Sequence, residues 1–246
     1  MRILYLIPGW MSRTPAGEAE MRRRLEFLRR HASPGVDVDV WDVRGGPSSI
    51  ESAYEEYLSV PGALERLTEA ARAGFDGVIL GCFGDPGVDA ARELVSIPVI
   101  GPGEAAMLIA ASLGHRFTIV TILDSVIQPL RRLAWSAGVE AKLTSVRSVN
   151  IPVLELARDR ETTYTRMLEA GRLARDVDGA DTIVLGCMTM AFLNEHEKLA
   201  QALGIPVVNP VQASLKFVEA LCAMGIAHSK RAYPVPPKLA AEAKLV

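Results

Sequence analysis

The chain has 246 residues, of which 49% are hydrophobic and 23% are charged, so it is long enough to bury a large core. Its formal net charge of -2 provides no overall attraction to a phosphate backbone or an anionic membrane, and we expect no nucleic-acid partner. Gly, Pro or charged residues interrupt each apolar run well before the roughly 20 residues needed to cross a bilayer. These features predict a globular, cytoplasmic protein with no membrane partner.

Short β-branched, apolar runs alternate with amphipathic stretches along the whole chain. The expected strands cover, in order, residues 3–7, 36–43, 78–80, 99–100, 117–123, 143–149, 182–185 and 207–208. Two Ala-rich helices are expected at residues 104–113 and 212–224. Because strands and helices alternate in this way in βαβ units, the pattern predicts an α/β fold with parallel sheets.

The second half of the chain repeats the plan of the first. Residues 75–82 read FDGVILGC, and residues 180–187 read ADTIVLGC. After each segment come a helical stretch, a strand that begins Ile-Pro-Val and an Ala-rich helix. The period of roughly 105 to 115 residues is close to the size of a small domain. The sequence therefore predicts two pseudo-symmetric domains with two equivalent cysteines, Cys82 and Cys187.

Both cysteines follow the carboxyl end of a strand, where ligands bind in open parallel sheets. A helix is expected soon after each, with Asp85-Pro86 capping the first and Thr189 the second. The partial positive charge of a helix N-terminus favours a thiolate and lowers a cysteine pKa. Two facing thiols suit racemisation, in which one group removes a proton from one face of a carbon and the other adds one to the opposite face.

Other candidate features are interpreted as structural. The three cysteines and four histidines show no metal-ligand spacing, and the Gly-rich turns match no nucleotide-binding fingerprint. Cys222 lies in an apolar helical stretch and is expected to pack as a small hydrophobe. The basic run Arg22–Arg24 is expected to form a solvated helix face.

Three motifs resemble the hydantoin and allantoin racemases of the aspartate/glutamate racemase superfamily. They are residues 81–87 (GCFGDPG), residues 103–121 with their GEAA and LGHRF segments, and residues 185–187 (LGC). The resemblance extends over nearly the whole chain. It implies two Rossmann-like domains, an active site in the interdomain cleft, Cys82 and Cys187 as catalytic thiols, no metal or pyridoxal phosphate cofactor, and a homo-oligomer.

The resemblance also implies domain boundaries and a binding site. The first domain is expected to comprise residues 1–98 plus 211–246, with a C-terminal helix that returns to it, and the second to comprise residues 99–210. The substrate-binding residues are expected to be Pro8, Gly9, Trp10, Phe83, Gly84, Thr121, Met188 and Thr189. Backbone N–H groups of residues 83–84 and 188–189 are expected to stabilise a carbanion. Trp10, Phe83, Met188 and Met190 are expected to form an apolar wall.

We expect a small-molecule substrate, a 5-substituted hydantoin or a related cyclic ureide. Relatives that racemise free acidic amino acids place Thr directly after each cysteine, whereas Phe83 and Met188 stand there in this chain. Arylmalonate decarboxylases keep only the second cysteine. Three alternatives stay open: an aspartate/glutamate-type amino-acid racemase, a maleate cis-trans isomerase, and a non-catalytic small-molecule-binding protein on the same fold.

Overall fold

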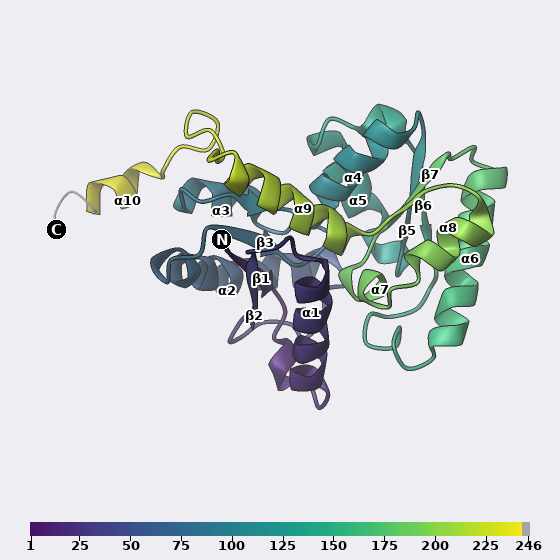
Figure 1. The fold of residues 1–246 in the computed structure, drawn as a ribbon, viewed down its shortest axis with the longest axis horizontal. Helices are drawn as coiled ribbons and strands as arrows, with labels where there is room; N and C mark the ends of the chain where they lie inside the picture. The colour runs from purple at the N-terminus through teal and green to yellow at the C-terminus, as the bar shows by residue number, and fades with distance from the viewer. Residues whose placement is uncertain (243–246) are drawn as a thin grey trace.

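A computed structural model describes residues 1–242 and contains two four-stranded parallel sheets (Figure 1). The first sheet has the order β2-β1-β3-β4 and consists of β1 (Arg2–Ile7), β2 (Asp37–Asp42), β3 (Gly77–Leu80) and β4 (Val99–Ile100). The second has the order β6-β5-β7-β8 and consists of β5 (Phe117–Thr121), β6 (Leu143–Ser148), β7 (Thr182–Leu185) and β8 (Val207–Val208). The same order in both sheets confirms the α/β fold class.

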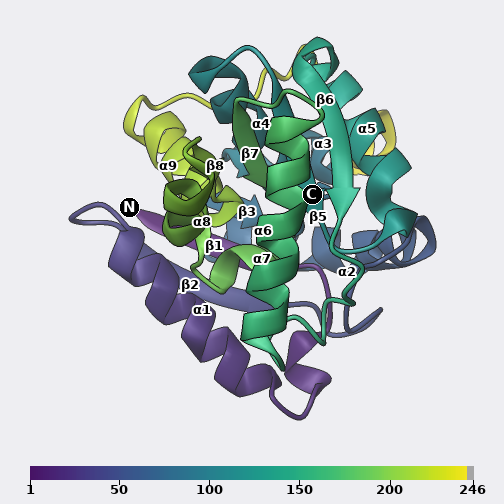
Figure 2. The same cartoon turned by 90° about the vertical axis from the view of Figure 1, so that its right-hand side faces the viewer.

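Ten α-helices within residues 1–242 surround the sheets. They are α1 (Gly17–His31), α2 (Ala53–Arg72), α3 (Val88–Leu94), α4 (Pro102–Leu113), α5 (Ile127–Ser136), α6 (Arg160–Asp176), α7 (Met188–Phe192), α8 (His196–Leu203), α9 (Pro210–Ala223) and α10 (Pro237–Glu242). The α6 helix packs across the second sheet, and α1 runs along β2 (Figure 2). No helix among these described residues is both long and apolar enough to cross a membrane.

Two helices exchange sheets. The α4 helix follows the first sheet in the chain but packs against β7 and β8, and α9 follows the second sheet but packs against β3 and β4. The two helices also pack against each other, and Figure 1 shows α9 crossing back over the first sheet. Because each sheet is covered by a helix from the other half, the core is continuous between them.

Equivalent aspartates anchor the central strands. The backbone N–H of Arg2, at the start of β1, donates to Asp76 Oδ2 at 2.7 Å. The backbone N–H of Arg116, just before β5, donates to Asp181 Oδ2 at 3.1 Å. These two hydrogen bonds occupy the same place in the two sheets, which is the arrangement expected of a duplicated plan.

The glycine before each pocket cysteine is required by close packing. A Cβ atom at Gly81 would lie 2.5 Å from the ring of Tyr5, and one at Gly186 would lie 2.6 Å from Cγ2 of Ile119. Tyr5 and Ile119 belong to the central strands β1 and β5. Each glycine therefore lets its chain cross the end of the central strand and brings the next residue to the same edge of its sheet.

The chain after α9 returns to the first sheet. His228 Nε2 accepts a hydrogen bond from the backbone N–H of Val99 at 3.0 Å, and Lys230 Nζ donates to the carbonyl oxygen of Val95 at 2.7 Å. Val99 lies in β4, so the first sheet extends past the predicted boundary at residue 98. Residues 243–246, placed in the first domain by the sequence analysis, lie outside the described residues.

Candidate active site

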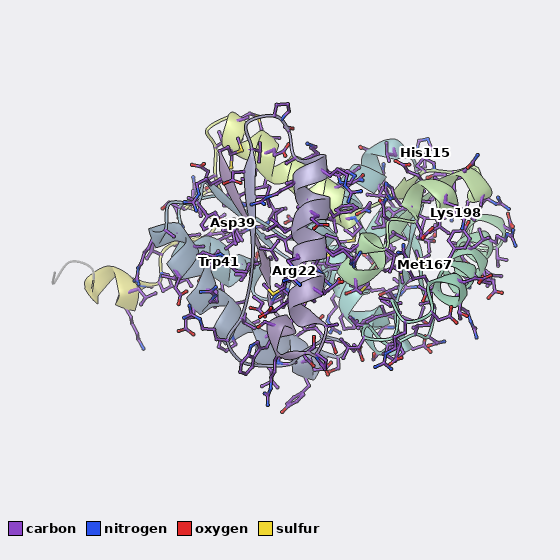
Figure 3. The ribbon with its side chains drawn as sticks, turned by 60° about the horizontal axis from the view of Figure 1, so that its bottom comes forward. Arg22, Asp39, Trp41, His115, Met167 and Lys198 are labelled. Atoms are coloured by element: carbon purple, nitrogen blue, oxygen red, sulfur yellow. The ribbon has the colours of Figure 1, made fainter. Side chains whose placement is uncertain are left out.

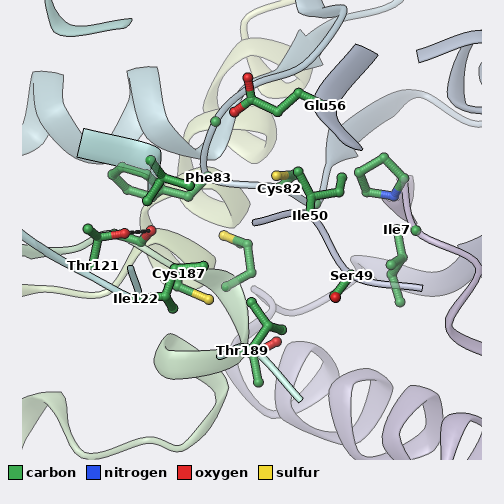
Figure 4. A pocket seen from close by; sticks show the side chains of 18 of the residues that line it. Ile7, Ser49, Ile50, Glu56, Cys82, Phe83, Thr121, Ile122, Cys187 and Thr189 are labelled. Atoms are coloured by element: carbon green, nitrogen blue, oxygen red, sulfur yellow. Dashed lines mark hydrogen bonds between the residues drawn. The ribbon is translucent and has the colours of Figure 1, made fainter. Parts of the chain in front are cut away.

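The carboxyl ends of both sheets meet at one pocket, which encloses about 660 Å³ with the open solvent at its mouth included. Cys82, which follows β3, and Cys187, which begins α7 after β7, both line it. Figure 4 shows their side chains entering the pocket from different segments of the chain. Most of the lining is apolar and includes Ile7, Met11, Ile50, Phe83, Ile122, Val126, Leu130, Val153 and Met188.

The loop after Cys82 is held by a buried carboxyl group. Asp85 accepts hydrogen bonds from the backbone N–H groups of Gly103 at 2.9 Å and Glu104 at 2.7 Å, in the first turn of α4. The prediction that Asp85 caps the next helix is wrong, because α3 begins only at Val88. Asp85 instead caps α4, whose own N-cap residue makes no side-chain cap bond.

Cys187 is itself the N-cap residue of α7, and it makes no side-chain cap hydrogen bond to the first turn of that helix. The prediction that Thr189 caps this helix is therefore wrong. The Thr189 hydroxyl instead accepts a hydrogen bond from Arg24 Nη2 at 2.9 Å. This contact joins α1, which lies beside the first sheet, to α7, which follows the second.

Burial controls the acidity of both thiols. Desolvation raises the pKa of Cys82 above its ordinary value, and the backbone N–H of Gly84 opposes this shift. Desolvation also raises the pKa of Cys187, against the backbone N–H groups of Met190 and Thr189. The expected net lowering of the thiol pKa is wrong, because removal of water from a thiolate outweighs the backbone hydrogen bonds. Both groups hold their protons more tightly than an exposed cysteine.

The structure brings most of the predicted binding residues together. Pro8, Gly9, Phe83, Gly84, Thr121, Met188 and Thr189 all line the pocket. The Thr121 hydroxyl donates to the carbonyl oxygen of Gly186 at 3.0 Å, so its proton is already engaged. Gly84 and Thr189, whose N–H groups are predicted to stabilise a carbanion, both line the pocket.

Two residues of the predicted apolar wall lie outside the pocket lining. Trp10 packs against the core between the first sheet and α2, with the guanidinium of Arg13 5.0 Å from its ring centroid. Met190 is fully buried in the main core. The apolar side of the pocket is formed by Phe83 and Met188 together with residues that the sequence analysis did not select.

Arg24 lines the pocket and is only 2% exposed, so the prediction of a solvated face is wrong at this position. Its Nε donates to Glu20 Oε1 at 3.0 Å. Phe27 and Leu28 are buried on the same helix, three and four residues further on. This spacing places Arg24 on their face of the helix, and the periodicity could have identified it in the sequence.

Glu56 is the second charged residue that the sequence analysis missed. It is half-buried on α2, and its Oε1 lies 2.5 Å from the position that a Cβ atom at Gly84 would take. Figure 4 shows its carboxyl group near Cys82. Burial raises the pKa of Glu56, and the positive charge of Arg132 opposes the shift.

The loop between β2 and α2 also lines the pocket. It follows the carboxyl end of a strand beside β1, and this position could have identified it in the sequence as part of the binding site.

Comparison with known proteins identifies the family. The family described as Asp/Glu/Hydantoin racemase matches residues 11–218. The chain belongs to this family. The resemblance inferred from the cysteine motifs is thereby confirmed, as is the assignment to the racemases, a class of isomerases.

Similar members of the Asp/Glu/Hydantoin racemase family align over most of the chain. A hydantoin racemase of Pseudomonas sp. strain NS671 is 37% identical over 78% of this chain and 77% of its own length. A hydantoin racemase of Rhizobium meliloti is 36% identical over 95% of each chain. The crystal structure of an allantoin racemase from Pseudomonas fluorescens is 32% identical, with a TM-score of 0.89, covering 96% of this chain and 97% of its own.

Proposed function

We propose that this racemase inverts the stereocentre of 5-substituted hydantoins, or of a related small cyclic ureide, without a cofactor. The observation that carries the proposal is that Cys82 and Cys187, at the ends of equivalent strands, line one pocket. We further propose that the chain acts as a homo-oligomer in the cytoplasm. The molar mass in solution tests the first of these two properties, and cell fractionation tests the second.

The reaction is a pair of proton transfers. One cysteine, as the thiolate, removes the proton from C5 of the ring, and the electron pair of the C–H bond delocalises into the adjacent carbonyl group. The other cysteine, as the thiol, adds its proton to the opposite face of the planar carbon. After the inversion the first cysteine is the thiol and the second is the thiolate. Inversion of the opposite enantiomer restores the original protonation states.

The charges in the pocket favour an uncharged ring over an acidic substrate. Glu56 as a carboxylate would repel the carboxylates of glutamate, aspartate or maleate, whereas it can accept a hydrogen bond from an N–H group of a ureide ring. Arg24 could attract a carboxylate, but two of its donors already serve Glu20 and Thr189. The apolar lining formed by Phe83 and Met188 suits an alkyl or arylalkyl substituent.

Polarimetry on a substrate panel tests the proposal. We expect loss of optical rotation with a single enantiomer of 5-benzyl- or 5-isobutylhydantoin, in buffer that contains a chelator and no added cofactor. Enzyme-free samples give the spontaneous rate to be subtracted. Glutamate and aspartate should keep their configuration, and maleate should yield no fumarate. Turnover of one of these acids in preference to every hydantoin would contradict the proposed substrate class.

The rate is expected to depend steeply on pH. Because burial raises the pKa of both thiols, little thiolate is present at neutral pH, and the active state with one thiolate becomes more populated as the pH rises. We expect kcat/KM to increase by about tenfold per pH unit until the profile levels off. The inflection should lie near or above about pH 8.5, the ordinary pKa of a thiol. Initial rates across this range provide the measurement. An inflection below neutral pH would contradict the expected rise in the pKa of the thiols.

A further inference from the structure

The charges around the two thiols differ, although the strands that carry them are equivalent. Cys187 lies at the N-terminus of α7 and lines the pocket together with Arg24, whose positive charge and the backbone N–H groups of Thr189 and Met190 lower the pKa of the thiol against the effect of burial. Arg24 is held in place by its hydrogen bonds to Thr189 Oγ1 at 2.9 Å and Glu20 Oε1 at 3.0 Å. A positive charge fixed beside a buried sulfur stabilises its thiolate.

Cys82 has the opposite surroundings. Glu56 lines the pocket beside Cys82, and the carboxyl groups of Glu56 and Asp85 raise the pKa of this thiol, whereas only one backbone N–H, that of Gly84, lowers it. The Glu56 carboxyl approaches the pocket from α2 and lies against Gly84. Negative charge near a buried sulfur disfavours its thiolate.

The remaining ionisable groups near the thiols do not remove this difference. Glu51, in the loop before α2, acts against a thiolate at Cys187, but it is not among the residues that line the pocket. Glu20 lies beyond Arg24 and offsets part of its charge. Tyr5 lies near both sulfurs and, with a pKa raised by burial, stays neutral. Arg132 opposes the rise in the pKa of Glu56 but does not reverse it.

We infer that Cys187 loses its proton before Cys82, and that Arg24 and Glu56 are positioning residues that set this order. The catalytic meaning of the order rests on the proposed function: the more populated form with one thiolate has Cys187 as the base and Cys82 as the acid. A substrate whose C5–H faces Cys187 therefore meets an enzyme already in the required state. The pseudo-symmetric fold carries an electrostatic asymmetry that assigns the two roles.

Alkylation with iodoacetamide measures the order without any substrate. The rate of modification of each cysteine is followed by mass spectrometry from about pH 6 to 11, and the midpoint of each curve reports its thiolate formation. We expect a lower midpoint for Cys187 than for Cys82. Cys187 is 8% exposed and Cys82 somewhat more, so access alone would favour Cys82, whereas the midpoint is independent of access.

Two variants should move the midpoints in opposite directions. Glu56→Gln is expected to lower the Cys82 midpoint by about one pH unit, and Arg24→Gln to raise the Cys187 midpoint by a similar amount. Arg24→Lys, which keeps the positive charge, should retain most of the wild-type midpoint. Glu56→Gln also keeps the test informative if Arg24→Gln fails to fold.

Matched controls lie on the same helices. Arg22→Gln on α1 (Figure 3) and Glu65→Gln on α2 remove a charge from exposed positions and should leave both midpoints unchanged. Cys222, half-buried outside the pocket, is an internal reference within each sample. A Cys82 midpoint at or below that of Cys187, or midpoints that neither Glu56→Gln nor Arg24→Gln moves, would overturn the inference.

The two proposals fail separately. If the midpoints show the expected order but the wild type racemises no hydantoin, the proposed function fails, and the inference that Cys187 loses its proton before Cys82 stands. If the wild type racemises hydantoins but the order is absent or reversed, the roles of Arg24 and Glu56 are wrong and the proposed function stands.

Discussion

Cys82→Ser and Cys187→Ser are each expected to lower the rate of hydantoin inversion by at least about 10³-fold. A serine hydroxyl is too weak an acid to form the base at working pH and too poor a proton donor to replace the thiol. Each residue is needed once in every inversion, because the carbon loses its proton on one face and gains one on the other. The measurement is the loss of optical rotation with each variant.

Proton exchange without inversion provides a second readout for these variants. In deuterated water the remaining thiolate can still remove and return a proton on its own face of the ring. Cys82→Ser should therefore introduce deuterium into one enantiomer, and Cys187→Ser into the other, with configuration retained. Chiral chromatography with mass detection separates these products, and an enzyme-free sample corrects for spontaneous exchange.

Cys222→Ser is the matched control for both changes. Cys222 lies outside the active-site pocket, and its thiol donates to the carbonyl oxygen of Asp76 at 3.3 Å, a bond that a serine hydroxyl can also make. Inversion by this variant should equal that of the wild type. If Cys82→Ser and Cys187→Ser both inverted hydantoins at the wild-type rate, other residues would have to carry out the proton transfers.

Asp85→Ala is expected to lower the free energy of unfolding by about 2 to 4 kcal/mol, because it leaves two donors in the first turn of α4 without a partner. Asp85 is only 9% exposed, so the two donors that it serves lie where water has little access. Urea denaturation gives the free energy. Asp89→Ala is the control: that side chain is 81% exposed, and its loss should change stability by less than about 1 kcal/mol. Equal losses in both variants would contradict the capping role.

The same carboxyl group should make stability depend on pH. Burial raises the pKa of Asp85 from 3.8 to about 8, against the opposing hydrogen bonds from Glu104 and Gly103. The folded protein therefore binds this proton more tightly than the unfolded chain does, and the resulting stabilisation is lost as the pH rises from about 4 toward about 8. Asp85→Asn removes this titration, so its unfolding free energy should vary less across that range than that of the wild type.

Local sequence patterns predicted a large part of the fold. The eight strands and both Ala-rich helices are confirmed, because alternating apolar runs and helical periodicity are properties of neighbouring residues. The duplicated segments that end in Cys82 and Cys187 predicted equivalent places in two sheets. Strand order then brings the carboxyl ends of β3 and β7 beside those of the central strands, and both cysteines reach the pocket.

The sequence by itself determined the α/β class, the repeat and the two cysteines, since each depends on residues close together in the chain. Only the tertiary structure decided the exchange of α4 and α9, the use of Asp85 as a cap for α4, and the entry of Arg24 and Glu56 into the pocket. The net pKa shift of the thiols also belongs to this second group. All of these depend on contacts between distant residues, because packing of separate elements determines which groups lose water and which charges they face.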